Sequence, residues 1–128
     1  MAFQVINPSV LPTPTGYNHA IRASGTPLFI SGQVSIGADG RTVGKGDPAA
    51  QAAQVFANLK SVVEAAGGSM NDVVKLTTYA VDLAYRPAIA EARAKVFAGG
   101  YYPASTFVVV SGLASPDFLL EIEAVAML

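Results

Sequence analysis

Cysteine is absent from this 128-residue chain, and histidine occurs only once, at His19. Without cysteine the protein has no disulfide, no thiolate nucleophile and no cysteine-ligated zinc or iron–sulfur centre. Zinc and similar sites usually take two or three imidazole or thiolate ligands, so a single histidine also argues against a transition-metal site. We therefore expect neither a structural nor a catalytic metal ion.

Charge is also scarce. Charged residues make up 13% of the chain, against about 25% in a typical soluble domain, while apolar residues make up 52%. This composition excludes a disordered chain, because disordered chains are poor in apolar residues and rich in charge. It also leaves too little charge to cover the surface of an ordinary monomer. We expect a permanent oligomer whose interface buries the surplus apolar surface.

The eight Lys and Arg residues are scattered along the chain and are balanced by nine acidic residues, for a net charge of −1. Nucleic-acid binding proteins usually carry a basic patch or stripe, so we expect no nucleic-acid partner. No apolar run approaches the roughly 20 residues of a membrane span, and the N-terminal segment lacks the features of a signal peptide. The expected location is the cytoplasm, with no membrane partner.

Hydrophobic patterning predicts six strands and two helices in a single domain over residues 1–128. The strands are expected near residues 3–6, 17–23, 28–36, 73–81, 106–110 and 118–127, and the helices near 48–66 and 87–98. Asp47 and Pro48 are typical of an N-cap and of the first position of a helix. The order βββαβαββ predicts an α+β domain with both helices on one face of a single sheet.

The last predicted strand has two different faces, because side chains alternate along a strand. One face is fully apolar and is expected to pack under the helices; it carries Phe118, Leu120, Ile122, Ala124 and Ala126. The other face is half apolar, and we expect a second subunit to cover it; it carries Leu119, Glu121, Glu123, Val125 and Met127.

Four polar features allow both a structural and a functional interpretation. Residues 40–46 resemble a phosphate-binding loop, but one residue is missing between the glycines, so a flexible loop is the better interpretation. His19, without a visible partner, is interpreted as structural. Gly32 permits either close backbone approach to a ligand or a bulge. Composition alone favours a structural role for Glu121, although a desolvated carboxylate beside Leu119 would suit proton transfer.

Short motifs occur in one order along nearly the whole chain: Tyr17 after Gly16, Ser31-Gly32-Gln33, Asn58-Leu59, Asp72-Val73-Val74-Lys75, Pro103-Ala104 and Glu121-Ile122-Glu123-Ala124. Their order and spacing resemble the Rid family of reactive intermediate deaminases (the YjgF-type or L-PSP endoribonuclease superfamily). The resemblance implies a chorismate-mutase-like fold, a six-stranded mixed sheet with two helices on its outer face. It also implies a homotrimer whose sheets close around a central barrel, with three small-molecule pockets at subunit interfaces and no cofactor or metal.

In the best-studied branch of that family, the pocket hydrolyses enamines and imines to ketoacids and ammonia. Tyr17, Gly32 and Glu121 of this chain match that branch, and the resemblance implies that Glu121 positions or activates the hydrolytic water. Tyr17 is expected to act with Glu121 in catalysis and to hold the substrate. Further substrate contacts are expected from Ser31, Gly32, Ser105 and backbone N–H groups near Phe107.

The chain departs from that branch at three positions. Ser105 stands where the branch has an arginine that grips the substrate carboxylate, Ala90 where it has an asparagine, and Phe107 where it has a cysteine. Such a charge-assisted hydrogen bond contributes roughly 1.5–3 kcal/mol, so its loss weakens substrate capture about tenfold to more than a hundredfold. We expect a divergent branch that hydrolyses an atypical imine or enamine, with Arg86 as a replacement cation.

Two alternative functions remain open. The first is a non-enzymatic trimer that kept the pocket and binds a metabolite or a partner without turnover. The second is a pathway-specific enzyme with different chemistry on a ring or ketone-type substrate. Ribonuclease activity is disfavoured by the scattered basic residues and the net charge.

Overall fold

A computed structural model describes residues 3–99 and 101–128 of the chain. Its elements follow the predicted order: β1 (Phe3–Ile6), β2 (Ala20–Ala23), β3 (Pro27–Gln33), α1 (Pro48–Ala65), β4 (Val73–Ala80), α2 (Arg86–Val96), β5 (Ala104–Val109) and β6 (Leu120–Met127). Two single 3₁₀ turns, η1 (Met70–Asp72) and η2 (Leu83–Tyr85), precede β4 and α2. The α+β class and the order βββαβαββ are confirmed.

The six strands are divided between two sheets rather than forming one. β1 and β2 form an antiparallel pair, and the other strands form a four-stranded sheet in the order β3-β6-β4-β5. That sheet is mixed, because β4 and β5 run parallel while β6 is antiparallel to both of its neighbours. Asn18, in the loop before β2, forms an isolated parallel bridge with Ala104 of β5, and its N–H donates to the Pro103 carbonyl at 3.2 Å.

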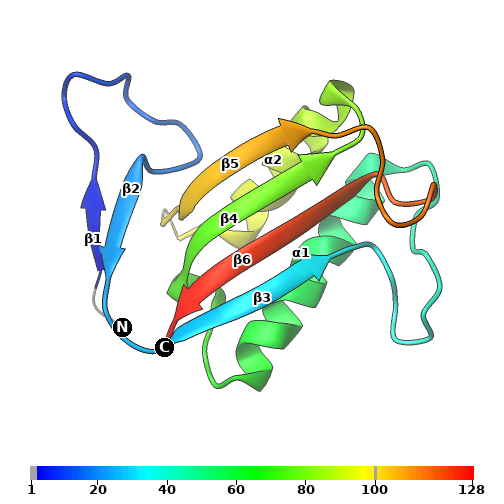
Figure 1. Ribbon diagram of the computed structural model, residues 1–128, viewed down its shortest axis with the longest axis horizontal. Coiled ribbons are helices and arrows are strands. Elements are labelled where there is room, and N and C mark those ends of the chain that lie inside the picture. The colour runs from blue at the N-terminus through cyan, green and yellow to red at the C-terminus, as the bar shows by residue number, and fades with distance from the viewer. Residues whose placement is uncertain (1–2, 100) are drawn as a thin grey trace.

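Both helices pack on the same face of the four-stranded sheet (Figure 1). The first of them, α1, begins as the sequence predicts: the Asp47 carboxylate accepts the Ala50 N–H at 3.1 Å, and Pro48 takes the first turn. Apolar residues of α1 pack against the alternate residues of β6 that were expected there. The core therefore includes Val55, Phe56, Leu59 and Val63 from α1 and Leu120, Ile122, Ala124 and Ala126 from β6.

The opposite face of the four-stranded sheet, here called the open face, is covered by neither helix (Figure 1). It carries the half-buried side chains of β6 that the sequence places there, among them Glu121 and Glu123. Phe29, which pairs with Val125 across β3 and β6, is 77% exposed, and Val108 on β5 is 37% exposed. Phe29 and Val108 thus lie on the two edge strands of this face, with the half-buried residues of β6 between them. In the described part of the chain, no helix is long and apolar enough to cross a bilayer.

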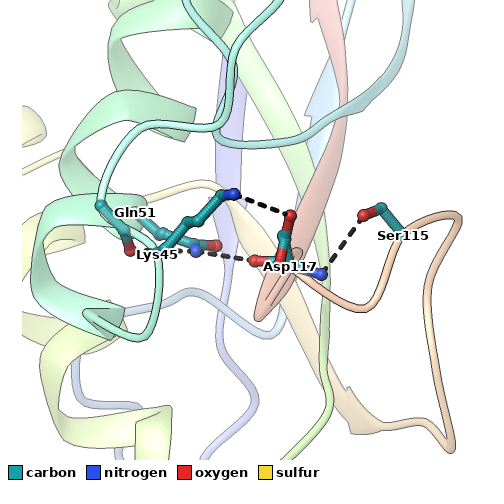
Figure 2. Close-up of polar contacts among 5 residues, drawn as sticks. Lys45, Gln51, Ser115 and Asp117 are labelled. Carbon is teal, nitrogen blue, oxygen red and sulfur yellow. Dashed lines mark hydrogen bonds and ion pairs between the residues drawn. The ribbon is translucent and has the colours of Figure 1, made fainter.

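A buried glutamine holds the start of β6 in place. Gln51 in α1 is fully buried, and its side-chain amide donates to the carbonyls of Gly44 at 3.1 Å and Asp117 at 2.9 Å. Its side-chain oxygen accepts the Leu119 N–H at 3.0 Å. Figure 2 shows this cluster, in which Lys45 also forms an ion pair with Asp117 at 3.5 Å. The contacts connect α1 to the chain two residues before Glu121.

Candidate active site

A pocket of about 270 Å³ lies between α2 and the helix-covered face of the sheet. Four of the predicted site residues line it: Tyr17, Arg86, Ser105 and Phe107. The other lining residues are Thr15, Phe56, Thr78, Ile89, Ala90 and Arg93. The chain thus brings together more than half of the residues that the sequence singled out.

The register of β4 and β5 explains why two of these residues face the helices. Ser105 pairs with Leu76 and Phe107 with Thr78, and both of those β4 residues are buried under the helices. Partners in register on neighbouring strands share a face, so Ser105 and Phe107 point toward α2. There the Arg86 guanidinium carbon lies 5.5 Å from the centre of the Phe107 ring, within cation–π range.

Contacts of the two residues after Tyr17, Asn18 and His19, fix the loop that carries Tyr17. The His19 Nε2 donates to the Pro12 carbonyl at 2.8 Å, and the His19 ring meets the Tyr17 ring edge-on at 5.4 Å between centroids. The Asn18 side-chain amide donates to the Tyr102 carbonyl at 2.6 Å. His19 therefore has the structural role that the sequence analysis favoured: it holds the loop that places Tyr17 at the pocket.

Arg93 is a site residue that the sequence analysis missed. It lines the pocket from the second turn of α2 beyond Arg86, and its Nε is buried without a hydrogen-bond partner. Burial lowers the pKa of Arg93, and the nearby Arg86 cation lowers it further against an opposing effect of Tyr102. An arginine remains charged despite such a shift. The signal was in the sequence, since residues seven apart lie on one face of a helix.

The remaining predicted residues, Ser31, Gly32 and Glu121, lie away from this pocket. Ile30 pairs with Ala124 and Gln33 with Ile122, so two residues of β3 stand opposite one residue of β6 in a bulge. The Glu121 carboxylate fills the space beside Gly32: a Cβ added to Gly32 would lie 1.9 Å from Glu121 Oε2. Gly32 thus lies in a bulge, as the structural interpretation predicts, and the group that lies against it is the Glu121 carboxylate. A ligand contact at Gly32 stays a prediction.

A second polar cluster accompanies Glu121 on the open face. The Tyr79 hydroxyl donates a short hydrogen bond to the Glu123 carboxylate, and this bond is the main cause that raises the pKa of Tyr79. Lys75 Nζ donates to the Thr106 hydroxyl at 2.7 Å; burial lowers the pKa of Lys75 and the charge of Glu123 partly opposes this shift. The Glu123 carboxylate is thus already bound to the side chain of a neighbouring strand.

Glu121 and the pocket lie on opposite faces of the same sheet. Glu121 pairs with Tyr79 on the open face, whereas Ser105 and Phe107 face α2. A single chain therefore provides a pocket with cations and hydroxyl groups, and separately a carboxylate beside a backbone bulge. In the described ranges no three histidine, aspartate or glutamate side chains are grouped as metal ligands.

Comparison with known proteins agrees with this architecture. The family model described as Endoribonuclease L-PSP matches residues 9–128. The chain belongs to this family, the YjgF/Rid superfamily. A RutC family protein of Pyrococcus horikoshii is 43% identical over 124 residues, which cover 96% of each chain.

Two solved structures of similar proteins have the same fold. A Rid-family protein of unknown function from Yersinia pestis, YyfB, is 42% identical over the full length of both chains, with a TM-score of 0.93. A protein of unknown function from Pseudomonas aeruginosa is 36% identical, with 99% of this chain and 93% of that chain covered and a TM-score of 0.72. These relatives support the α+β Rid fold that the sequence motifs indicated.

Proposed function

We propose that this chain acts as a homotrimer that hydrolyses an imine or enamine and releases ammonia. Each site joins the pocket of one subunit to Glu121 of the next. The observation that carries the proposal is the separation of the two halves: the pocket has no carboxylate among its lining residues, and Glu121 lies on the other face of the sheet. Two copies of the chain are the simplest way to join them.

The open face supports assembly. It presents Phe29 and Val108 to solvent together with the half-buried residues of β6, and the chain has little charge with which to solvate such a surface. Packing these faces together would bury apolar area, which is the main favourable contribution to a permanent interface. The proposed trimer buries this face around its axis and leaves the helices outside.

The proposed mechanism needs only proton transfer and orientation. Glu121 takes a proton from a water molecule as the water oxygen adds to the C=N carbon, which gives a tetrahedral carbinolamine. With the imine nitrogen protonated at the outset, Glu121 returns the proton taken from water to the carbinolamine nitrogen. The C–N bond then breaks, ammonia leaves, and the hydroxyl proton passes back to the Glu121 carboxylate as the carbonyl forms. An enamine first takes a proton on carbon to become the imine. The hydroxyl of Tyr17 and backbone N–H groups near Phe107 orient the substrate.

Ser105 favours one alternative, a trimer that binds a metabolite or partner without turnover, because the branch with known deaminase chemistry has an arginine there. The test is to follow ammonia release from freshly generated 2-aminoacrylate and related imines with the purified protein, against the spontaneous rate in buffer. The proposal predicts acceleration in proportion to protein concentration. Thermal stabilisation by such compounds without acceleration would support the binding alternative and contradict the hydrolase.

A further inference from the structure

Two arginines of α2 face the same pocket. Arg86 and Arg93 are seven residues apart, which is close to two helical turns and places them on one side of the helix with about 10.5 Å between them along its axis. Both line the cavity, Arg86 from its exposed rim and Arg93 from a half-buried position. Each guanidinium carries five N–H donors in a planar arrangement that suits a carboxylate.

Arg93 is held in place without a counter-charge. Its guanidinium lies against Gly16, where a Cβ would come within 2.6 Å of Nη2, and the φ of +76° at Gly16 also favours glycine. The Nε is buried and has no hydrogen-bond partner. A charged donor that is buried without a partner is costly, so a group that accepts from Arg93 would be favoured in this position.

No acidic side chain lines the pocket. The ion pairs among the described residues join Arg41 to Asp39, Lys45 to Asp117, Lys60 to Glu64 and Lys95 to Glu91, and none includes Arg86 or Arg93. The rest of the polar lining consists of hydroxyl groups, from Thr15, Tyr17, Thr78 and Ser105. The pocket therefore holds two separated positive charges together with neutral hydrogen-bonding groups.

We propose that Arg93 and Arg86 form a two-point clamp for a small dicarboxylate, with one carboxylate on each guanidinium. Arg93 grips the deeper carboxylate, and Arg86 grips the outer one at the rim beside Phe107. The inference rests on the proposed function and narrows it: the substrate is an imine or enamine of a dicarboxylic acid. One Glu121 from a neighbouring subunit would not neutralise both guanidinium groups, whereas a dicarboxylate provides one carboxylate for each.

The test is isothermal titration calorimetry on the assembled wild-type protein with stable probes. Succinate and glutarate should bind at least tenfold more tightly than butyrate and than inorganic phosphate. Arg93→Met should weaken binding of both dicarboxylates and butyrate roughly tenfold to a hundredfold, since each charge-assisted contact has about that effect. Arg86→Met should weaken only the dicarboxylates. Arg41→Met, at an exposed loop position, is the matched control and should bind all probes as the wild type does.

Equal affinity for butyrate and the dicarboxylates, or tighter binding of phosphate, would overturn the clamp. Wild-type dicarboxylate affinity in Arg86→Met would overturn it as well, and this variant keeps the test decisive if Arg93→Met fails to fold. Because these probes are not hydrolysed, the clamp and the proposed reaction fail separately. Dicarboxylate binding without ammonia release would retain the clamp and reject the hydrolase, and ammonia release without dicarboxylate preference would do the reverse.

Discussion

The two faces of the four-stranded sheet differ in the chemistry they present. The helix-covered face contributes to a pocket with two arginines and several hydroxyl groups but no carboxylate among its lining residues. The open face carries Glu121 and Glu123, and its lysine, Lys75, is already bonded to Thr106. One face has cationic and hydroxyl groups suited to an anion, and the other has a carboxylate suited to proton transfer.

This difference indicates how a small domain with few charges could build a reactive site. Within one chain a carboxylate beside Arg86 or Arg93 would form an ion pair and occupy the place of a substrate. In the proposed trimer, separating the charges across the sheet keeps the arginines and Glu121 of one chain from pairing with each other, and the neighbouring subunit supplies the carboxylate. The predictions below test this division of labour, beginning with the largest expected effect.

Replacing Glu121 by glutamine should have the largest effect on turnover. The side chain keeps its size beside Gly32 but loses its capacity as a base, so the rate of ammonia release should fall about 10²- to 10⁴-fold. Glu123→Gln is the matched control, because Glu123 lies on the same strand face and is bonded to Tyr79. The rate of ammonia release by this variant should fall far less. Unchanged release in Glu121→Gln would remove that residue from the mechanism.

Replacing Phe29 by lysine should dissociate the assembly. Phe29 is 77% exposed on the open face, and an aromatic anchor in an interface is commonly worth about 2 kcal/mol or more, which corresponds to about a thirtyfold loss of affinity. Light scattering at micromolar concentration should show a lower mass than for the wild type. Val10→Lys, at an 89% exposed loop position, should keep the wild-type mass. A Phe29→Lys protein of unchanged mass would show that this face is not the interface.

Replacing Gln51 by leucine should destabilise the fold by about 3 kcal/mol. The change removes two side-chain donors and leaves the Leu119 N–H buried without its acceptor. Urea denaturation gives the free energy of unfolding. Gln54→Leu on the same helix is the control and should cost about 1 kcal/mol or less, because within the described part of the chain the Gln54 side chain makes one hydrogen bond, to Asn58. Equal losses in the two variants would contradict the role assigned to Gln51.

A smaller effect is expected from an alkaline titration of the free energy of unfolding. Burial raises the pKa of Tyr101 to about 12, and its hydroxyl donates to the Val73 carbonyl at 2.9 Å. The neutral phenol therefore stabilises the folded state. Its contribution to the free energy of unfolding is complete below pH 10 and is lost as the pH rises toward 12. Since the ring is half exposed, we expect about 1 kcal/mol after screening.

Tyr101→Phe should thus reduce the fall in unfolding free energy between pH 10 and 12 relative to the wild type. An identical alkaline slope in wild type and Tyr101→Phe would show that the phenol does not sense the fold.

Local sequence patterns predicted the elements well where they were strong. Asp47-Pro48 located the start of α1, and the alternation in β6 separated its buried face from its open face. The strand expected from residue 17 instead begins at Ala20, because Asn18 and His19 hold the preceding loop through side-chain hydrogen bonds. The bond from Asn18 reaches Tyr102, far away in the sequence, and no local pattern reveals it.

The site was only partly predictable for the same reason. Motif order pointed to Tyr17, Ser105 and Glu121, but which of them share a face depends on the register between β4, β5 and β6. Register is set by long-range pairing, and a shift of one residue would reverse every assignment. Arg93, in contrast, lies seven residues after Arg86 and therefore on the same face of α2, a local signal that the sequence itself carries.

The most direct test of the central claim is to mix two inactive variants. Glu121→Gln removes the carboxylate half, and Ala90→Trp fills the pocket half with an indole ring. Trimers assembled from equal amounts of both should recover about a quarter of the wild-type ammonia release, because a head-to-tail ring places an intact pocket next to an intact Glu121 in about one interface of four. Mixed trimers that stay as inactive as either variant alone would contradict a site built from two subunits.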